Sequence, residues 1–329
     1  MTSIAGLCTI VFLITGIPAH GITFPTDGNE VKWQAQWITA SQNQDKSNTW
    51  LCFRKDFNVA QVPDTAVALI AVDTKYWLWI NGRMVVFEGG LKRGPTPEDT
   101  YYDEVNIAEY LKPGENTVAA LTWYFGKNGF SHNSSGKAGF LFQCITPVVK
   151  IVSNNSWMAA VHPAFENTVG PEPNFRLSET NIRFDARRDI GDWQDPKTAL
   201  AGLGFSNAQE LGLPPGRPWN NLVRRPIPQW KNLGLKDYNK VSISHGIDFD
   251  TVVCDLPYNA QITPFFTIEA PEGLTIKIYT DNYYIGNTVN IRAEYVTKSG
   301  EQSYESKGWI NGHKVFYIVP HGIEIRELK

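Results

Sequence analysis

The sequence predicts an all-β protein of two β-sandwich domains joined by a long linker rich in Pro and Gly. From Trp33 onward, short apolar or alternating runs are separated by Gly, Pro, Asn and Asp, which is the pattern of sandwiches. Long stretches with the apolar period of an amphipathic helix are scarce. At 329 residues the chain exceeds what one hydrophobic core usually serves, so two packed domains are expected.

The first 21 residues are predicted to be a signal peptide. The long apolar run from Ile4 to Ile17 is shorter than the roughly 20 residues that a membrane-spanning helix needs. Ala19 and Gly21 are spaced like the small residues before a signal-peptidase cut, although Met1 to Ser3 carries no Lys or Arg. We therefore expect residues 1–21 to be removed and the remaining chain, without a membrane span, to be secreted or periplasmic.

Residues 22–165 are expected to form the first sandwich. Asn81-Gly82, between two apolar runs, predicts a hairpin over Tyr76 to Phe87, because both residues tolerate the positive φ of a type I′ turn. The sequence KPGEN from Lys112 predicts a type II turn before the strand Thr117 to Tyr124. About eight strands are expected, enough to close a jelly roll. The others lie at 36–38, 49–57, 66–72, 102–107, 138–146, 148–152 and 157–161.

Residues 166–236 form the predicted linker, because Pro, Gly and Asn accumulate there and the regular pattern is lost. A structureless stretch of that length is unusual within a compact domain, so we expect it to pack along the sandwich and bury Trp193, Trp219 and Trp230. From Tyr238 the alternation returns. Residues 237–329 therefore predict a second, smaller sandwich, with strands at 241–243, 251–256, 260–268, 274–279, 291–297, 314–319 and 323–326.

Charge, cysteine usage and motifs exclude several function classes. The 30 Lys and Arg residues nearly balance 33 Asp and Glu residues, with no basic stripe, which argues against nucleic acid as a partner. Removal of the signal peptide leaves three widely spaced cysteines without a CxxC, which predicts buried thiols and neither a zinc site nor a disulfide framework. The histidines have no metal-ligand spacing. No nucleophile elbow, zincin, Walker or dinucleotide signature occurs.

Aromatic and polar side chains suggest where a sugar would bind. Aromatic residues make up 12% of the chain, and their flat faces suit carbohydrate as well as sandwich cores. The segment 123–133 (WYFGKNGFSHN) places rings beside amide and imidazole groups, and the segment 101–104 places tyrosines beside carboxylates. The candidate carbohydrate-binding residues are Trp123, Tyr124, Asn128, His132, Asn133, Tyr102 and Asp103. The alternative is that these rings fill the core and that the loops are merely solvated.

Two further polar stretches have open alternatives. The oxygen-rich loop that contains Glu98, Asp99, Asp103 and Glu104 either holds Ca²⁺ or sugar hydroxyls or is a solvated loop, and no other cofactor is expected. The stretch 280–284, followed by Arg292 and Glu294, either lines a pocket or packs against a neighbour. A glycosidase needs two carboxylates held roughly 5 to 10 Å apart, and no such pair is indicated by spacing.

Five segments resemble those of a known family. The hairpin YWLWINGRMV from Tyr76 and the run YYDEVNIAEYLKPGENTVAAL from Tyr101 also resemble segments of the sugar-binding domains of β-galactosidases. More specific are RFDARRDIGDW from Arg183, PPGRPWNNLVRRPIPQW from Pro214 and RAEYVTKSGEQSYESKGWINGHKVFY from Arg292. In this order, the segments are similar to the N-terminal half of the bacterial α-L-rhamnosidases, glycoside hydrolase family 78.

The resemblance implies a galactose-binding-like jelly roll, a linker and a second β-domain that leads into an (α/α)₆ barrel, where an inverting reaction uses two glutamates. We expect that barrel to be absent here, so no catalytic residue is carried over and no turnover is expected from this chain alone. The first hypothesis is a non-catalytic portion that supports the active-site cleft or binds carbohydrate, with a rhamnose-containing glycan and the barrel as partners. The alternatives are a stand-alone lectin-like module and a purely structural β-domain with an apolar patch at 318–328.

Overall fold

The computed structural model describes residues 31–40, 46–91, 93–129, 132–168, 181–282, 284–285, 288–289 and 292–329. The predicted signal peptide, residues 1–21, lies outside this range. Apart from strands, the described residues contain the short 3₁₀-helices η1 (Ala108–Tyr110) and η2 (Ala186–Arg188). No helix in the described ranges combines the length and the apolar character needed to cross a membrane. The predicted all-β class, built of sandwiches, is confirmed.

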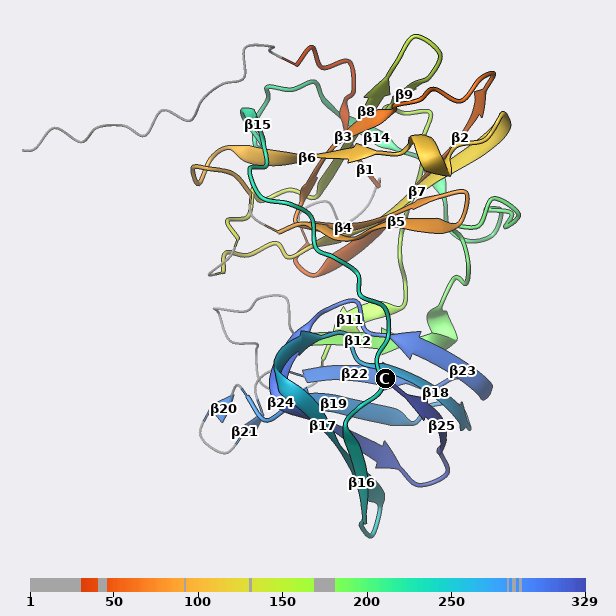
Figure 1. Ribbon diagram of the computed structural model, residues 1–329, viewed down its shortest axis with the longest axis vertical. Helices are drawn as coiled ribbons and strands as arrows, with labels where there is room; N and C mark the ends of the chain where they lie inside the picture. The colour runs from red at the N-terminus through yellow and green to blue at the C-terminus, as the bar shows by residue number, and fades with distance from the viewer. Residues whose placement is uncertain are drawn as a thin grey trace, which may run out of the picture. The chain divides into compact units, whose positions relative to one another are not determined.

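The first sandwich consists of two facing sheets. Its strands are β1 (Trp37–Thr39), β2 (Thr49–Val59), β3 (Val67–Asp73), β4 (Lys75–Ile80), β5 (Arg83–Gly90), β6 (Thr100–Asn106), β7 (Gly114–Tyr124), β8 (Gly139–Ile145), β9 (Lys150–Val152), β10 (Met158–Val161), β13 (Ser206–Asn207), β14 (Gln209–Gly212) and β15 (Leu222–Arg224). One sheet has the order β14-β1-β8-β3-β6-β15, with β9 beside β8, and the other has the order β13-β10-β2-β7-β4-β5. In Figure 1, β3, β6 and β8 form one layer and β4, β5 and β7 the layer that faces it.

The second sandwich pairs a large sheet with a small one. Its strands are β11 (Phe165–Asn167), β12 (Asn181–Asp185), β16 (Lys240–His245), β17 (Phe249–Ile262), β18 (Phe265–Ala270), β19 (Thr275–Thr280), β22 (Arg292–Val296), β23 (Gly300–Glu305), β24 (Ile310–Pro320) and β25 (Glu324–Leu328). The large sheet has the order β11-β12-β22-β19-β24-β17-β16, and the small one β23-β18-β25. A separate hairpin joins β20 (Tyr284–Ile285) and β21 (Thr288–Val289).

Both predicted turns of the first sandwich are present. Asn81 has φ 52° and Gly82 has φ 77°, and Ile80 pairs with Arg83, so β4 and β5 form the expected hairpin with left-handed backbone at both central residues. Gly114 has φ 88°, as the third position of a type II turn requires. These local signals therefore set the pairing of β4 with β5 and the residue at which β7 begins.

Both faces of the sheet that contains β2, β4 and β7 are covered. On the inner face, Phe53 packs against Phe140 of the opposite sheet, with ring centroids 5.0 Å apart. On the outer face, Trp50 stacks on Trp123 at 4.5 Å, and Trp193 from the chain segment after η2 lies over Trp79 at 6.1 Å. Because neither face meets water, all six residues of β4 (KYWLWI) are buried and the apolar run is continuous rather than alternating.

The segment predicted as a linker, residues 166–236, contains short strands. β12 pairs in parallel with β22, β15 pairs in parallel with β6, and β13 and β14 extend the two sheets of the first sandwich. Trp193 and Trp219 are buried, as expected, but Trp230 is 55% exposed, so that expectation was wrong. Trp230 follows two closely spaced prolines, Pro226 and Pro228, after β15, in a stretch that joins no sheet.

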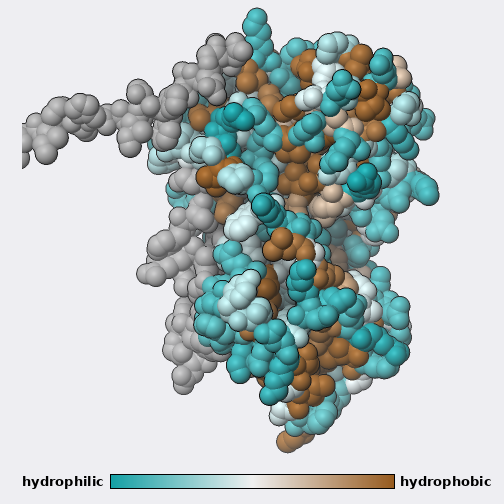
Figure 2. Space-filling view, viewed as in Figure 1, coloured by the Kyte–Doolittle hydropathy of each residue, from teal (hydrophilic) through white to brown (hydrophobic). Residues whose placement is uncertain are grey.

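The predicted apolar patch at 318–328 was also wrong. Ile323, Ile325 and Leu328 are half-buried, because they pack against the core between the two sheets of the second sandwich. Apolar side chains reach the surface instead around the β16–β17 hairpin, as the brown areas in that part of Figure 2 show. The most exposed of them are Val241, Ile243, Ile247 and Phe249.

Candidate functional site

The two aromatic candidates at the end of β7 are packed inside the protein. Trp123 is 1% exposed, stacks on Trp50 and donates its indole N–H to Oδ1 of Asn48 at 2.8 Å. Tyr124 is also 1% exposed and belongs to the core between the two sheets. The protein itself therefore covers both ring faces, which is the alternative that the sequence left open. Sugar stacking on either ring would require a core to open.

The loop candidates after β7 divide between the surface and the interior. Asn128 is exposed, and its Oδ1 accepts a hydrogen bond from the backbone N–H of Ser134 at 2.8 Å, which shapes the loop. Asn133 is half-buried. His132, in contrast, is 2% exposed and points inward. The two asparagines are thus accessible to a ligand, whereas the histidine belongs to a buried network.

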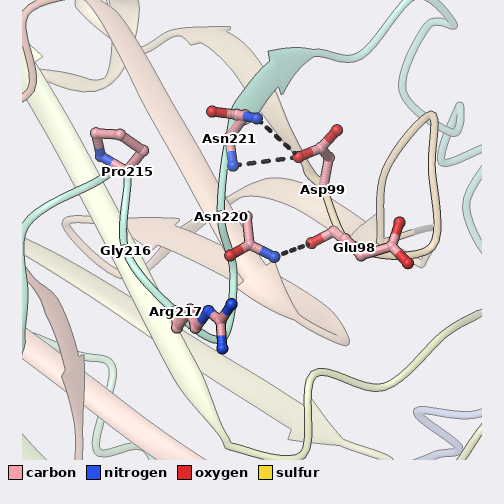
Figure 3. A pocket seen from close by; sticks show the side chains of 7 residues that line it. All are labelled: Glu98, Asp99, Pro215, Gly216, Arg217, Asn220 and Asn221. Atoms are coloured by element: carbon pink, nitrogen blue, oxygen red, sulfur yellow. Dashed lines mark hydrogen bonds between the residues drawn. The ribbon is translucent and has the colours of Figure 1, made fainter.

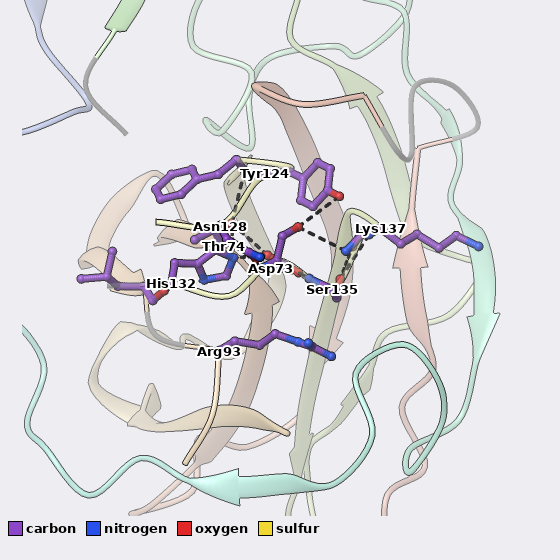
Figure 4. Close-up of polar contacts among 12 residues, drawn as sticks. Asp73, Thr74, Arg93, Tyr124, Asn128, His132, Ser135 and Lys137 are labelled. Atoms are coloured by element: carbon purple, nitrogen blue, oxygen red, sulfur yellow. Dashed lines mark hydrogen bonds and ion pairs between the residues drawn. The ribbon is translucent and has the colours of Figure 1, made fainter. Parts of the chain in front are cut away.

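That network joins three loops at one end of the first sandwich (Figure 4). His132 Nε2 lies 2.9 Å from Asp73 Oδ1 and 3.2 Å from Thr74 Oγ1, and its Nδ1 lies 2.8 Å from the backbone oxygen of Leu91. The backbone N–H of Ser135 donates to Asp73 Oδ2 at 2.7 Å. Burial raises the pKa of Asp73, but the hydrogen bonds from His132 and Ser135 and the charge of His132 outweigh it, so the pKa is lowered.

Asp73 was missed by sequence reasoning because it ends an apolar strand with no polar neighbour that marks it. The sequence VALIAVD predicts only a buried strand. In the structure Asp73 and His132 are 0% and 1% exposed at their side chains, and they hold the β3–β4 and β7–β8 connections together. The geometry therefore indicates a positioning role for His132, since every polar atom of its ring already faces a protein group.

The candidates on β6 are buried in a second cluster. Asp103 is 2% exposed; its Oδ2 accepts from the hydroxyl of Tyr76 at 2.8 Å, and its Oδ1 pairs with Arg225. Burial, together with the charge and hydrogen bond of Asp103, raises the pKa of Tyr76 well above its ordinary value. Tyr102 is 7% exposed and packs edge-on against Trp33 at 5.5 Å. Both candidates therefore anchor β6 from within.

The acidic loop does not gather its carboxylates at one point. Asp103 faces inward, whereas its neighbour Glu104 faces outward and pairs with Arg224 at 2.8 Å. Glu98 and Asp99 precede the strand and line a separate cavity. No group of three or more His, Cys, Asp or Glu side chains in the described part of the chain is arranged to hold a metal ion.

The polar stretch near residue 280 joins neighbouring strands of the second sandwich. Asp281 Oδ1 accepts hydrogen bonds from the backbone N–H groups of His313 at 2.8 Å and Lys314 at 3.1 Å. Glu294 is buried and pairs with Arg183 at 3.0 Å. Residue 283 lies outside the described residues, as does the side chain of residue 284. The described groups of this stretch therefore act between strands.

A cavity of about 400 Å³ lies beside the acidic loop that precedes β6 in the first sandwich (Figure 3). One wall comes from the residues just before β6 and the other from the turn before β15, and paired residues such as Glu98 and Asn220 are 122 positions apart in the sequence. Sequence reasoning singled out the first wall only, because nothing local indicates its partner. The lining residues are Glu98, Asp99, Pro215, Gly216, Arg217, Asn220 and Asn221.

Comparison by fold finds similar solved structures, whereas no family model and no curated protein sequence matches the chain. A GH78 family rhamnosidase of Bacillus sp. GL1 matches with a TM-score of 0.76 at 15% identity, covering 91% of this chain and 55% of that one. The chain has the fold of part of an α-L-rhamnosidase. The α-L-rhamnosidase from Aspergillus terreus matches with a TM-score of 0.66 at 16% identity, covering 90% of this chain and 36% of that one.

The rhamnosidase from Streptomyces avermitilis, solved in complex with L-rhamnose, matches with a TM-score of 0.58 at 16% identity. It covers 86% of this chain and 29% of that one, so this chain spans about half the length, or less, of these rhamnosidases. The resemblance expected from the sequence is thereby confirmed at the level of fold.

The buried carboxylates of this rhamnosidase-like fold, among the described residues, are paired with basic side chains. Glu88 on β5 illustrates the arrangement, since its Oε1 lies 2.5 Å from Lys75 Nζ, and the two side chains are 4% and 0% exposed. Such pairing satisfies a charge that water does not reach. The buried carboxylates in the described ranges and their partners are Asp73 with His132, Glu88 with Lys75, Asp103 with Arg225, Asp185 with Arg187 and Glu294 with Arg183.

Proposed function

We propose that this chain is the non-catalytic β-sandwich portion of an α-L-rhamnosidase, which supports the active-site cleft or binds carbohydrate. The observation behind the proposal is the match of 91% of the chain, at a TM-score of 0.76, to 55% of a family 78 rhamnosidase. Its partners would be a rhamnose-containing glycan and a helical barrel that supplies the catalytic glutamates. Export from the cytoplasm belongs to the same proposal and is supported by the sequence of residues 1–21.

The carboxylates support a portion without hydrolytic chemistry of its own. A glycosidase needs an acid and a base or nucleophile that face one sugar from two sides, roughly 5 to 10 Å apart. The buried carboxylates described above are each paired with a basic side chain, and Glu98 and Asp99 in the cavity are adjacent along one segment of chain. This arrangement suits structural pairing and ligand contact better than proton transfer to a glycosidic oxygen.

A stand-alone carbohydrate-binding module is the second candidate, and the cavity in Figure 3 favours it, because its polar side chains face open space. The two candidates differ in what they require. A supporting portion acts only beside a catalytic domain, whereas a lectin-like module binds sugar by itself. A purely structural β-domain would do neither.

Hydrolysis of an aryl α-L-rhamnoside by the purified full chain tests the proposal. We expect no release of the aryl group above the rate in buffer, because the buried carboxylates of the described residues are each paired with a basic side chain. Release that scales with protein concentration and disappears after heat denaturation would refute the assignment as non-catalytic.

A further inference from the structure

We propose that the cavity between residues 98–99 and 215–221 binds one neutral sugar ring through its hydroxyl groups. The inference rests on the proposed function, which supplies carbohydrate as the ligand class. It joins the loop that the sequence offered, at Glu98 and Asp99, to a second wall at 215–221 that the sequence did not indicate. A cavity of about 400 Å³ falls in the range of small-ligand sites, roughly 300 to 1,000 Å³. A single pyranose with its first hydration waters fits such a volume.

The walls of the cavity are held rigidly to each other and to the sandwich. The backbone N–H of Thr100 donates to the backbone oxygen of Asn221 at 2.9 Å. The hydroxyl of Thr100 donates to the backbone oxygen of Trp219 at 2.8 Å. Trp219 is 1% exposed and stacks on Trp37 of β1 at 4.2 Å. Arg93, beneath the walls, donates to backbone oxygens on both sides, Glu98 at 2.8 Å and Pro218. A ligand therefore meets a preorganised surface, and little ordering is needed on binding.

Several polar groups of the lining have no partner in the described part of the chain. The Asn220 amide N–H donates to the backbone oxygen of Glu98 at 3.0 Å, and the Asn221 amide N–H donates to Asp99 Oδ1 at 3.1 Å, so both side chains are fixed. Their amide oxygens accept no bond from a described residue, and the same holds for the Glu98 carboxylate. The guanidinium of Arg217 likewise has no hydrogen-bond or ion-pair partner among the described residues.

These groups match the chemistry of vicinal hydroxyls. Arg217 supplies donors only, whereas the Glu98 carboxylate and the two amide oxygens supply acceptors. A hydroxyl accepts from the guanidinium and at the same time donates to a carboxylate or an amide oxygen, so one sugar satisfies both kinds of group. The single guanidinium is balanced by Glu98 and Asp99, which disfavours an anionic ligand such as a uronate or a phosphate.

The backbone conformation of Asn220 also indicates that its side chain is held in a defined position at the cavity. Asn220 has φ 52°, a left-handed conformation that costs a non-glycine residue free energy and that the surrounding hydrogen bonds maintain. Its backbone N–H donates to the oxygen of Gly216 at 2.8 Å, which closes the turn between the two. A glycine at position 220 would adopt this backbone without strain but would lack the amide, which makes Asn220→Gly a suitable test variant.

The experiment titrates methyl α-L-rhamnopyranoside into the full chain, with binding followed by calorimetry and by saturation-transfer NMR. We expect saturable binding by the wild type. Arg217→Ala removes hydrogen bonds from a charged group to the ligand and should weaken binding about tenfold or more. Asn220→Gly removes a neutral amide and should weaken binding by about two- to tenfold. Arg224→Ala, an arginine seven positions from Arg217 and outside the lining, is the matched control and should bind as the wild type does.

The outcomes separate this inference from the proposed function. Turnover of the aryl rhamnoside would refute the proposed function, whatever the cavity binds. Absence of binding by the wild type, or binding that Arg217→Ala and Asn220→Gly leave unchanged, would overturn the cavity as a sugar site while leaving the proposed function intact. Tighter binding of glucuronate than of the neutral glycoside would overturn the assignment of a neutral ligand. Circular dichroism of each variant confirms that it folds before its binding is compared.

Discussion

Lys75 and Glu88 form an ion pair that is closed to water, and removing one charge should destabilise the first sandwich strongly. Nζ of Lys75 lies 2.5 Å from Oε1 of Glu88 and 5.8 Å from the ring centroids of both Trp123 and Phe125. In Glu88→Gln the ammonium stays among aromatic rings without a counter-charge. In Lys75→Met the carboxylate is left unpaired instead. Each single variant therefore buries an uncompensated charge.

The magnitude follows from the distance and the burial. For two charges 2.5 Å apart, an effective dielectric constant of about 20 gives an attraction of roughly 7 kcal/mol, much of which is offset by desolvation of the two ions. Removal of one partner leaves the desolvation cost without the attraction, so each single variant should lose about 3–5 kcal/mol of unfolding free energy. The double variant Lys75→Met/Glu88→Gln buries no charge and should lose far less than the sum.

Urea unfolding followed by tryptophan fluorescence measures these losses, because Trp123 lies beside the pair and packs with Trp50 and Trp77 in one cluster of the first sandwich. Free energies are compared at equal slopes with urea, since a changed slope would signal a different unfolding transition. Single losses below about 1 kcal/mol, or losses that simply add in the double variant, would refute the reasoning that the pair is buried and coupled.

Three further predictions concern pH, packing and thiols. Because the folded-state pKa of Asp73 is lowered, its carboxylate stabilises the fold above the unfolded-state pKa, and this contribution disappears as pH falls through the folded-state value. Asp73→Asn should therefore lower the free energy of unfolding by about 1–3 kcal/mol at pH 7 and leave it unchanged at a pH below both pKa values. Urea titrations at several pH values measure this, and a difference between variant and wild type that stays constant with pH would contradict it. Trp219→Ala should cost about 3–5 kcal/mol in thermal or urea unfolding, whereas exposed Trp230→Ala should change stability by less than about 0.5 kcal/mol; equal effects would be inconsistent with the burial. Burial raises the pKa of Cys144 to about 11, that of Cys254 to about 12 and that of Cys52 well above its ordinary value. A thiol-specific reagent at pH 8 should therefore react with these thiols only after unfolding, and rapid reaction of the native protein would contradict this.

Local turn chemistry and apolar runs predicted the strands that lie in the middle of the sheets. Asn81-Gly82 defines its hairpin because two adjacent residues adopt positive φ, a requirement that few other pairs meet. The short strands within residues 166–236 were not predictable in the same way. β12, for example, pairs Asn181 with Arg292, and its partner lies more than a hundred positions away. A strand of five residues or fewer between prolines has too few positions to show a period.

The sequence could propose loops for the candidate site but not the contacts of their side chains. The loop after β7, for example, carries His132 of the buried network. A sequence cannot distinguish a ring that stacks on sugar from one that stacks on Trp50, as Trp123 does, because both need the same apolar faces. His132 likewise shows no sequence feature that reveals its partner Asp73. Arg217 lines the cavity only because the fold places the turn before β15 beside residue 98, which no local sequence feature indicates.

The most direct test of the account is one NMR experiment on the full chain mixed with methyl α-L-rhamnopyranoside. Saturation transfer to the ligand reports binding, and the anomeric signal followed over a day reports cleavage in the same sample. The account predicts saturation transfer that Arg217→Ala weakens by about tenfold or more in apparent affinity, with no free rhamnose formed. Appearance of free rhamnose at a rate proportional to protein concentration would contradict the assignment of this chain as a non-catalytic, carbohydrate-contacting portion of a rhamnosidase.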